Sequence, residues 1–342
     1  MKKVFIIAEA GVNHNGKMEL AYKLVDAAKE AGVDAVKFQI FKSEKLISKS
    51  TKMADYQKEN LKENISQLDM VKKLELSYED FIKINEYCKE KGIMFMATPF
   101  DNDSLDFLVD ILKADVLKIG SGDLNNYPFL EKVALKNKEI ILSTGMSNLS
   151  DIEGALDFIS QYTDKEVKVL HCTTNYPCPM NEVNLKAMNT IKDAFQVAVG
   201  YSDHTLGIEV PIAAVALGAE IIEKHFTLDK TMEGPDHVAS LEPNELKEMT
   251  RTIRNIEKAL GSGIKKPNKS EVKIQSIVKR KIVLAKEVEA NHILTENDLE
   301  YKRCENGIES KYYKSIIGKK VKRKIEADSP LMWEDIVQKE IL

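Results

Sequence analysis

Two histidines offer the clearest chemistry in this 342-residue sequence. His204 and His225 each follow a short apolar run, and the carboxylates Asp203, Glu223 and Asp236 lie close to them in the sequence. A single histidine after a strand is more often a hydrogen-bonded structural residue, but two after successive strands favour a metal. Imidazole with carboxylate or water suits Mn, Zn, Fe or Co, and two protein ligands leave positions for substrate. The pattern therefore predicts a divalent metal between His204 and His225 and leaves its identity open.

Two lysines, Lys37 and Lys118, lie inside apolar runs and would point into a largely apolar interior. A lysine buried without a partner costs several kcal/mol, so an anion must compensate it. One interpretation is an ion pair, for instance with Glu9, and a Schiff-base lysine is also open. We favour a cradle for phosphate and carboxylate. The hydroxyls expected to contribute to that cradle belong to Ser121, Ser143 and Ser202.

These residues must be positioned by regular elements, and short apolar runs rich in Val, Ile and Phe recur along the chain. Polar turns and segments with helical spacing separate the runs. Because hydrophobicity within each run is continuous rather than alternating, we expect strands that are buried on both faces and therefore parallel. The eight predicted strands cover residues 4–8, 35–38, 94–98, 116–119, 139–143, 167–171, 197–201 and 220–224.

Eight such units indicate an α/β protein with a closed (β/α)8 TIM barrel. A doubly wound open sheet is the rival, but the turn after the first predicted strand is GVNHNG rather than the GxGxxG of that fold. In a TIM barrel the active site lies at the C-terminal ends of the strands. Polar or ionisable residues stand at that end of every predicted strand, so we expect them to meet on one rim.

The composition changes near residue 260, where a stretch rich in Gly, Pro, Ser and Lys begins. Such a stretch is typical of a linker, and short β-like pieces follow it. We expect a TIM-barrel catalytic domain at 1–262, a linker at 263–280 and a small β-rich domain at 281–342. A module of this size is marginal as an independent folding unit.

Charge and cysteine content exclude several classes of protein. The formal net charge of −4 provides no global positive field, which argues against a nucleic-acid binder. No run approaches the roughly 20 apolar residues of a membrane span. The four cysteines show no paired close spacing, which favours a reduced cytoplasm over a disulfide framework.

Motifs at the predicted strand ends resemble those of the bacterial sialic acid synthase family, which includes N-acetylneuraminate synthase and its legionaminic and pseudaminic relatives. The matching stretches are, in chain order, AEAGVNHNG, VKFQIFK, ATPFD, LKIGSGDLNN, ILSTGM, LHCTTNYPCP, GYSDHTLG, EKHFTLDK and GPDH. The later stretch KRCENGI resembles the antifreeze-like, or SAF, domain that closes those enzymes. The resemblance covers nearly the whole chain.

The resemblance implies a condensation of phosphoenolpyruvate with N-acetylmannosamine, which gives N-acetylneuraminate and phosphate. An N,N'-diacetyllegionaminic acid synthase acting on 2,4-diacetamido-2,4,6-trideoxymannose is the alternative. The metal, Mn²⁺ before Mg²⁺ or Co²⁺, would polarise the aldehyde oxygen of the sugar.

The resemblance also assigns roles to single residues. His204 and His225 match the metal-holding and catalytic histidines, and Glu9 matches the carboxylate that positions or deprotonates the attacking water. The positions that match phosphoenolpyruvate contacts are Lys37, Lys118, Ser121, Ser143 and Ser202. The positions that match sugar contacts are Asp123, Tyr176 and Asp236.

Arg303 matches an arginine that the SAF domain inserts into the barrel mouth of a partner subunit, where it meets the N-acetyl group. A domain-swapped homodimer is therefore expected. Two departures from the family pattern stand out. Asp123 replaces a glutamate, which shortens the side chain by one methylene, and Cys304 and Glu305 replace the usual Pro and Gly beside Arg303.

Three alternative functions can be compared with the residues at the predicted strand ends. A metal aldolase or a synthase of the Kdo-8-phosphate type would share the barrel and the use of a metal or of phosphoenolpyruvate. A saccharide-binding or ice-binding protein with an inactive barrel predicts loss of the chemistry at the strand ends. That chemistry is present in Glu9, Lys37, Lys118, His204 and His225.

Overall fold

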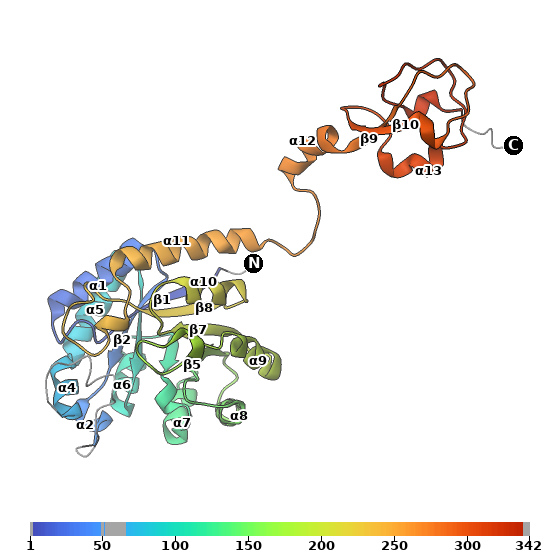
Figure 1. The fold of residues 1–342 in the computed structure, drawn as a ribbon. Coiled ribbons are helices and arrows are strands. Elements are labelled where there is room, and N and C mark those ends of the chain that lie inside the picture. The colour runs from blue at the N-terminus through green and yellow to red at the C-terminus, as the bar shows by residue number, and fades with distance from the viewer. Residues whose placement is uncertain (1–2, 49–50, 52–65, 338–342) are drawn as a thin grey trace. The chain divides into compact units, whose positions relative to one another are not determined.

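The computed structural model describes residues 3–48, 51 and 66–337. The larger of its two units is built around eight parallel strands (Figure 1). The strands are β1 Phe5–Gly11, β2 Ala35–Ile40, β3 Met94–Pro99, β4 Val116–Ile119, β5 Glu139–Ser143, β6 Val167–His171, β7 Val199–Asp203 and β8 Ile221–His225. Each coincides with one of the eight predicted apolar runs, so the prediction of their number and order is confirmed.

The strands close into a barrel. Their hydrogen-bonded order is β3-β2-β1-β8-β7-β6-β5-β4, and every neighbouring pair in that order is parallel. The two outer strands of this order, β3 and β4, are themselves in contact, which completes the ring. The predicted (β/α)8 TIM barrel is therefore confirmed.

Five strands, β1, β2, β3, β7 and β8, extend further toward their C-terminal ends than the apolar runs indicated, and two of them matter most for the site. β7 reaches Asp203 because Ser202 and Asp203 pair with Glu223 and Lys224 of β8. Likewise, β8 reaches His225, which pairs with Glu9 of β1. Apolar runs mark burial, whereas strand ends are set by backbone pairing, and here pairing continues into polar residues. His225 is thus the last residue of its strand rather than a residue beyond it.

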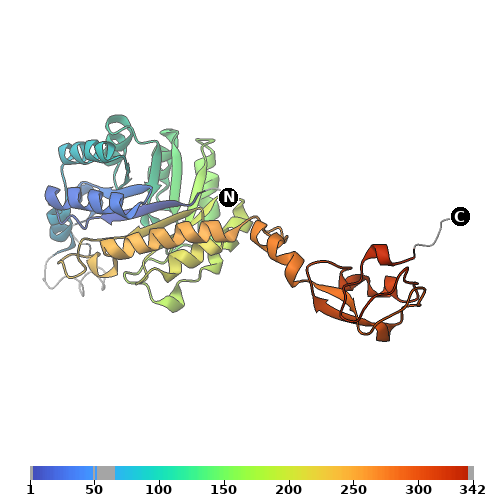
Figure 2. The ribbon, with the colours of Figure 1, turned by 90° about the horizontal axis from the view of Figure 1, so that it is seen from above.

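Helices cover the outside of the barrel (Figure 2). Helix α11, which begins at Pro243, packs against α1 and α10. The helices of this part are α1 Met18–Ala31, α2 Ser43–Leu46, α4 Gln67–Leu74, α5 Tyr78–Lys91, α6 Asn102–Asp106, α7 Tyr127–Leu135, α8 Leu149–Ser160, α9 Lys186–Phe195, α10 Glu209–Ala216 and α11 Pro243–Leu260. Shorter turns are the π-helix η1 Phe107–Ile111 and the 3₁₀ helices η2 Ser121–Asp123, η3 Met180–Glu182 and η4 His237–Ala239.

An apolar layer fills the inside of the barrel. Side chains of alternate residues on a strand point to the same side, so each strand gives the interior every second residue. The buried members of this layer come from six different strands and form one cluster, separate from the core between strands and helices. They are Ile7, Ala35, Met96, Ile141, Leu170 and Ile221. This layer, here called the apolar floor, lies beneath the side chains at the C-terminal ends of the strands.

A second small cluster forms where the chain leaves β2. Phe41 packs there with Met70, Val71 and Leu74 of α4, and Val12 after β1 completes the group. Helix α4 starts where it does because the Ser66 hydroxyl accepts a hydrogen bond from the backbone N–H of Asp69 at 3.1 Å. The buried face of α4 packs against the segments that follow β1 and β2.

Residues 263–342 form a second compact unit with its own core, and the first unit ends at Ser262. Its apolar cluster includes Ile282, Leu284, Ile308 and Leu331. The elements are α12 Lys269–Val278, β9 Arg280–Leu284, β10 Leu299–Arg303 and α13 Tyr313–Ile316, with the 3₁₀ helices η5 Glu296–Asp298, η6 Ser310–Tyr312 and η7 Trp333–Asp335. Strands β9 and β10 pair antiparallel. Helix α12 occupies most of residues 263–280, the segment predicted to be a linker.

No helix in the described ranges is both long and apolar enough to cross a membrane.

Candidate active site

A polar layer lies directly above the apolar floor of the barrel. Glu9, Lys37 and Glu223 each come two residues after a floor residue, on β1, β2 and β8. Side chains two residues apart on a strand point to the same side, so these groups also enter the barrel, one layer nearer its mouth. The sequence repeats apolar-x-polar at the ends of the strands, and this repeat builds the site.

These groups surround a cavity of about 160 Å³, here called the inner cavity. Lys37 is 2% exposed and Glu9 is 1% exposed, and the two form an ion pair. The Lys37 ammonium also donates to Thr98 Oγ1 at 3.0 Å and lies 3.6 Å from Glu223 Oε2. Gln39 Nε2 lies 3.4 Å from Glu9 Oε1. The Lys37–Glu9 ion pair, which the sequence left open as the alternative to an anion cradle, therefore exists, and Glu223 is a second carboxylate beside it.

Lys118 lies on the other side of Glu223. Its ammonium donates to Ser143 Oγ at 2.7 Å and lies 3.7 Å from Glu223 Oε1, which also accepts a hydrogen bond from Ser202 Oγ at 3.0 Å. Ser121 Oγ lines the same cavity and accepts a hydrogen bond from the backbone N–H of Gly145 at 2.9 Å. Two ammonium groups and three hydroxyls thus meet in one small space, a donor set suited to phosphate and carboxylate oxygens.

The two buried carboxylates have different proton affinities. Burial, together with the charge of Glu223, raises the pKa of Glu9 to about 7, although Lys37 opposes this rise. Burial would also raise the pKa of Glu223, but the charges of Lys118 and Lys37 prevail and lower it to about 2. When two neighbouring carboxyl groups have pKa values this far apart, one can transfer a proton while the other stays ionised and stabilises charge. Glu9 is the group that can exchange a proton near neutral pH.

The two lysines differ as well. Burial lowers the pKa of Lys118. The nearby carboxylate of Glu223 opposes this effect but does not outweigh it. Burial also acts on Lys37, but Glu223 and Glu9 outweigh it and raise the pKa of that ammonium.

His204 and His225 face each other across the mouth, with ring centroids 5.6 Å apart. The Tyr176 ring lies 4.1 Å from the His204 ring and meets His225 edge-on at 5.6 Å. His204 Nδ1 is 2.6 Å from the carbonyl oxygen of Thr173, which can only accept a hydrogen bond. Nδ1 therefore carries the hydrogen, and Nε2 keeps its lone pair on the side of the cavity.

This histidine pair fits a metal ligand set. Burial lowers the pKa of His204 and lowers that of His225 well below its usual value, so both imidazoles are neutral at physiological pH. His225 Nδ1 is buried and has no hydrogen-bond partner among the described residues. Within residues 3–48, 51 and 66–337, no group of three or more His, Cys, Asp or Glu side chains is arranged so that it could hold one metal ion. The pair would thus leave most coordination positions to water or substrate.

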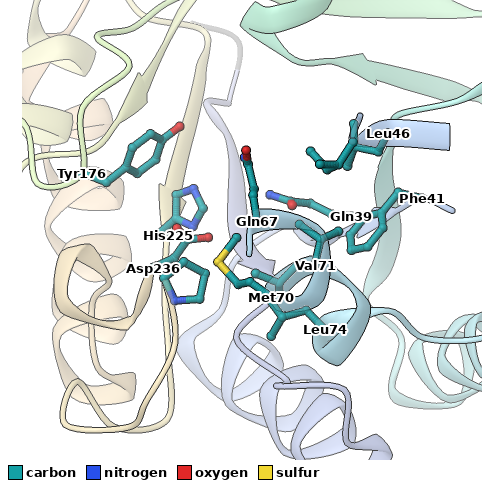
Figure 3. A pocket seen from close by; sticks show the side chains of 13 residues that line it. Gln39, Phe41, Leu46, Gln67, Met70, Val71, Leu74, Tyr176, His225 and Asp236 are labelled. Carbon is teal, nitrogen blue, oxygen red and sulfur yellow. The ribbon is translucent and has the colours of Figure 1, made fainter. Parts of the chain in front are cut away.

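A second cavity of about 200 Å³, here called the outer cavity, adjoins the inner one (Figure 3). Gln39, Tyr176 and His225 line both, so the two spaces share one wall. Asp236 lines the outer cavity, where burial raises the pKa of its carboxyl to about 6. The rest of the wall is mostly apolar. Its apolar members are Val12, Phe41, Leu46, Ile47, Met70, Val71, Leu74 and Pro235.

The barrel brings most of the predicted residues together. The inner cavity is lined by Glu9, Lys37, Lys118, Ser121, Ser143, Tyr176, Ser202, His204 and His225, and the outer cavity adds Asp236. Asp123 ends the same short turn as Ser121 but lines neither cavity, and its carboxylate accepts a hydrogen bond from Asn126 at 3.0 Å. Arg303 is an exposed residue of β10 in the second unit and is not part of this group. The roles assigned to all these residues remain predictions.

Several residues that line the two cavities were not among the predicted site residues, and four of them are polar side chains that bear on the site's chemistry. Gln39 and Thr98 stand at strand ends, and Glu223 lies two residues before His225, so position alone could have indicated them. Position in a barrel strand does not reveal that Glu223 lies between both lysines, because that depends on how β8 faces β2 and β4. Gln67 lies outside the strands on α4, and no motif marks it.

Comparison with known proteins identifies the family. The model of the NeuB family matches residues 24–265, and that of the SAF domain matches residues 279–337. The chain belongs to the NeuB family. The N,N'-diacetyllegionaminic acid synthase of Campylobacter jejuni is 51% identical over 93% of this chain and 96% of its own length. The synthase of that name from Legionella pneumophila is 46% identical over 97% of this chain and 94% of its own length.

A solved structure agrees with this assignment. The crystal structure of an N-acetylneuraminic acid synthetase from Leptospira borgpetersenii matches with a TM-score of 0.72 and 38% identity. The match covers 80% of this chain and 90% of that chain. The predicted resemblance to the sialic acid synthase family, including its SAF domain, is thus confirmed.

A fully buried ion pair holds the segment that carries His204. The Lys224 ammonium donates to Asp203 Oδ2 at 2.6 Å and also to the carbonyl oxygen of Thr205. Both side chains of the pair are 0% exposed. Asp203 in turn accepts hydrogen bonds from the backbone N–H and hydroxyl of Thr205. The turn after β7 is therefore fastened to β8 on either side of His204.

Replacing Lys224 tests this fastening. Lys224→Met leaves the Asp203 carboxylate buried without its cation, so we expect the free energy of unfolding to fall by about 3–5 kcal/mol. Urea denaturation followed by circular dichroism measures the change. Lys138→Met is a matched control, because Lys138 pairs with Asp115 at the surface and should contribute less than about 1 kcal/mol. Equal stability of the two variants would contradict the role of the buried pair.

Proposed function

We propose that this protein joins phosphoenolpyruvate to an open-chain N-acetylated sugar and releases phosphate, which gives an acidic nine-carbon sugar. The observation that carries the proposal is the position of two buried lysines beside a pair of neutral histidines at the mouth of one barrel. The names of its NeuB relatives, which are synthases of legionaminic and neuraminic acids, support the same reaction class.

The inner cavity suits phosphoenolpyruvate. That substrate carries a phosphate and a carboxylate, and Lys37 and Lys118 provide one ammonium for each end. Hydroxyl groups of Ser121, Ser143 and Ser202 provide uncharged donors between them. In the protein without substrate, Glu9 and Glu223 are the anions that compensate the two lysines.

The histidine pair suits a divalent cation, and we propose Mn²⁺, with Mg²⁺ or Co²⁺ as the next candidates. His204 Nε2 and His225 Nδ1 are the ring nitrogens that would hold it. A bound cation would polarise the aldehyde oxygen of the sugar as a Lewis acid. The Tyr176 ring, in contact with both imidazoles, holds them in place.

Glu9 is placed to handle the proton of the reaction. A carbon–carbon bond forms between C3 of phosphoenolpyruvate and the aldehyde carbon as the C=O π bond breaks. Its electron pair passes to the aldehyde oxygen, which takes a proton from solvent and becomes a hydroxyl, and C2 becomes electron-deficient. Water adds to C2, and Glu9 takes its proton, for which a pKa of about 7 is suitable. Loss of phosphate then leaves the keto group at C2. In the protein without substrate, Lys37 pairs with Glu9 and holds that carboxylate in position.

The sugar that we propose is 2,4-diacetamido-2,4,6-trideoxymannose, which makes N,N'-diacetyllegionaminic acid the product. Two relatives of that name match over nearly their full lengths. The apolar wall of the outer cavity also suits a sugar with a methyl group at C6 and an acetyl group at C4. N-acetylmannosamine, which the sequence placed first, has hydroxyls at both positions. It is the second candidate, favoured by the similarity to the Leptospira synthetase.

The second unit would complete the site in a dimer. Arg303, exposed on β10, would contact the N-acetyl group of the sugar from a second copy of the chain, as the family resemblance implies. The SAF-domain match over residues 279–337 supports this proposal.

A direct assay discriminates the two sugars. With phosphoenolpyruvate and Mn²⁺ present, kcat/KM for 2,4-diacetamido-2,4,6-trideoxymannose should exceed that for N-acetylmannosamine by about tenfold or more, because one buried polar group left unpaired already costs about 1–3 kcal/mol. Phosphate release measures both rates. A preference for N-acetylmannosamine would reverse the assignment of the sugar and leave the reaction class unchanged.

Removal of metal tests the histidine pair. Treatment with a chelator followed by dialysis should abolish phosphate release, and added Mn²⁺ should restore it. His204→Ala should lower Mn²⁺ affinity in a binding titration, a readout that does not depend on turnover. His171→Ala is the control, because His171 hydrogen-bonds the carbonyl oxygens of Val183 and Asn184 and lines neither cavity. Full activity of the metal-free protein would refute the role of the metal.

Replacing Glu9 tests its part as a base. Glu9→Gln keeps the shape of the side chain but cannot take a proton, so we expect kcat to fall by about 10²–10⁴-fold. In the unmodified protein a base must be ionised, so kcat/KM should be lost as pH falls through about 7, and this limb should disappear in the variant. Glu139→Gln, at the opposite end of the barrel, is the control. An unchanged acidic limb in Glu9→Gln would assign it to another group.

A further inference from the structure

Gln67 extends into the outer cavity from the first turn of α4 (Figure 3). In that view it stands between Tyr176 and His225 on one side and Gln39 and Leu46 on the other. Its side-chain oxygen, Oε1, is buried and has no hydrogen-bond partner among the described residues. A buried amide oxygen without a donor is unfavourable, so its presence at this position calls for a donor supplied from the cavity.

The surroundings of Gln67 define the kind of donor. Three other residues that line the cavity, Met70, Val71 and Leu46, present only hydrocarbon or thioether groups. A ligand group that fits here combines one N–H or O–H with an apolar end. An acetamido group has this composition, because its N–H lies beside a methyl group. A water molecule or a bare hydroxyl would satisfy Oε1 but would leave the apolar wall without contacts.

The position of the cavity defines which part of the sugar arrives there. The inner wall of the outer cavity is formed by His225 and Tyr176, and the aldehyde carbon C1 belongs beside His225 if the proposed reaction is right. The substituent on C2 is adjacent to that carbon and stays near the histidines. The substituent on C4 is three carbons from C1, so in the proposed orientation of the sugar it would reach the outer cavity, toward α4.

We propose that Gln67 determines specificity for the 4-acetamido group of the sugar. Gln67 Oε1 accepts a hydrogen bond from the amide N–H on C4, and the acetyl methyl packs against Leu46, Met70 and Val71. The proposal rests on the proposed function and adds to it the residue that distinguishes a 2,4-diacetamido sugar from one without nitrogen at C4. Gln67 thereby acts through binding and takes no part in the bond-forming steps.

The test compares the kinetic constants of two proteins, each with two sugars. The proteins are the full chain with Mn²⁺ and its Gln67→Leu variant, which keeps the size of the side chain and removes the oxygen. The sugars are 2,4-diacetamido-2,4,6-trideoxymannose and its analogue with two hydrogens at C4. For the diacetamido sugar, Gln67→Leu should raise KM about tenfold or more, with kcat and the KM for phosphoenolpyruvate within about twofold. For the analogue, which has no donor at C4, KM should be the same in both proteins.

Two controls separate this role from a structural one. Gln161→Leu makes the same chemical change on an exposed residue at the end of α8 and should leave every constant unchanged. The thermal midpoint of Gln67→Leu, measured alongside, shows whether α4 remains folded. A KM that rises equally for both sugars would overturn the role of Gln67 in recognising C4.

The experiment also distinguishes failure of this proposal from failure of the proposed function. If the unmodified protein releases phosphate with N-acetylmannosamine and not with the diacetamido sugar, both the proposed sugar and the role of Gln67 are wrong. If it uses the diacetamido sugar and Gln67→Leu uses that sugar equally well, the proposed function holds and the role of Gln67 alone is wrong.

Discussion

The charged group inside the barrel mouth is the interaction on which the rest of the site depends. Lys37, Lys118, Glu9 and Glu223 are all almost fully buried, and each is acceptable there only because the others compensate its charge. Removing any one would leave an unpaired charge away from water. The barrel tolerates this group because an apolar layer fills the space beneath it and eight strand ends fix the side chains around it.

In the proposed function, the same group receives a substrate with several negative charges. Glu223, between both lysines, stays ionised, whereas burial leaves Glu9 close to its protonation midpoint at neutral pH. An incoming phosphate and carboxylate can therefore take over the lysines, while Glu9 is left to exchange a proton. The two carboxyl groups differ because Lys118, Lys37 and the Ser202 hydroxyl stabilise ionised Glu223, whereas burial and the charge of Glu223 outweigh Lys37 at Glu9.

Charged and apolar side chains occupy different layers of the mouth. The inner cavity is built from strand ends, which are rigid and share one register, and it holds the charged groups. Helix α4, outside the barrel strands, supplies the far wall of the outer cavity, where apolar side chains and Gln67 lie. Substitutions in α4 and the residues around Phe41 can therefore change the outer cavity without disturbing the buried charges.

Much of the fold and part of the site could be predicted from the sequence. The eight apolar runs predicted the strands because parallel strands buried on both faces must be continuously apolar, and the polar residue at each run's end predicted the rim. The motifs around Glu9, Lys37, His204 and His225 predicted the family. The ends of β7 and β8 were placed too early, because backbone pairing persists where hydrophobicity stops.

What the sequence by itself determined was therefore which side chains reach the mouth of the barrel, since alternation along a strand is a local property. Only the tertiary structure decided which of them touch. That Glu223 lies between two lysines depends on strands brought together by closure of the ring. That Gln67 lies across from His225 depends on how α4 packs against Phe41 and Val12, contacts between residues far apart in the chain, which no local pattern encodes.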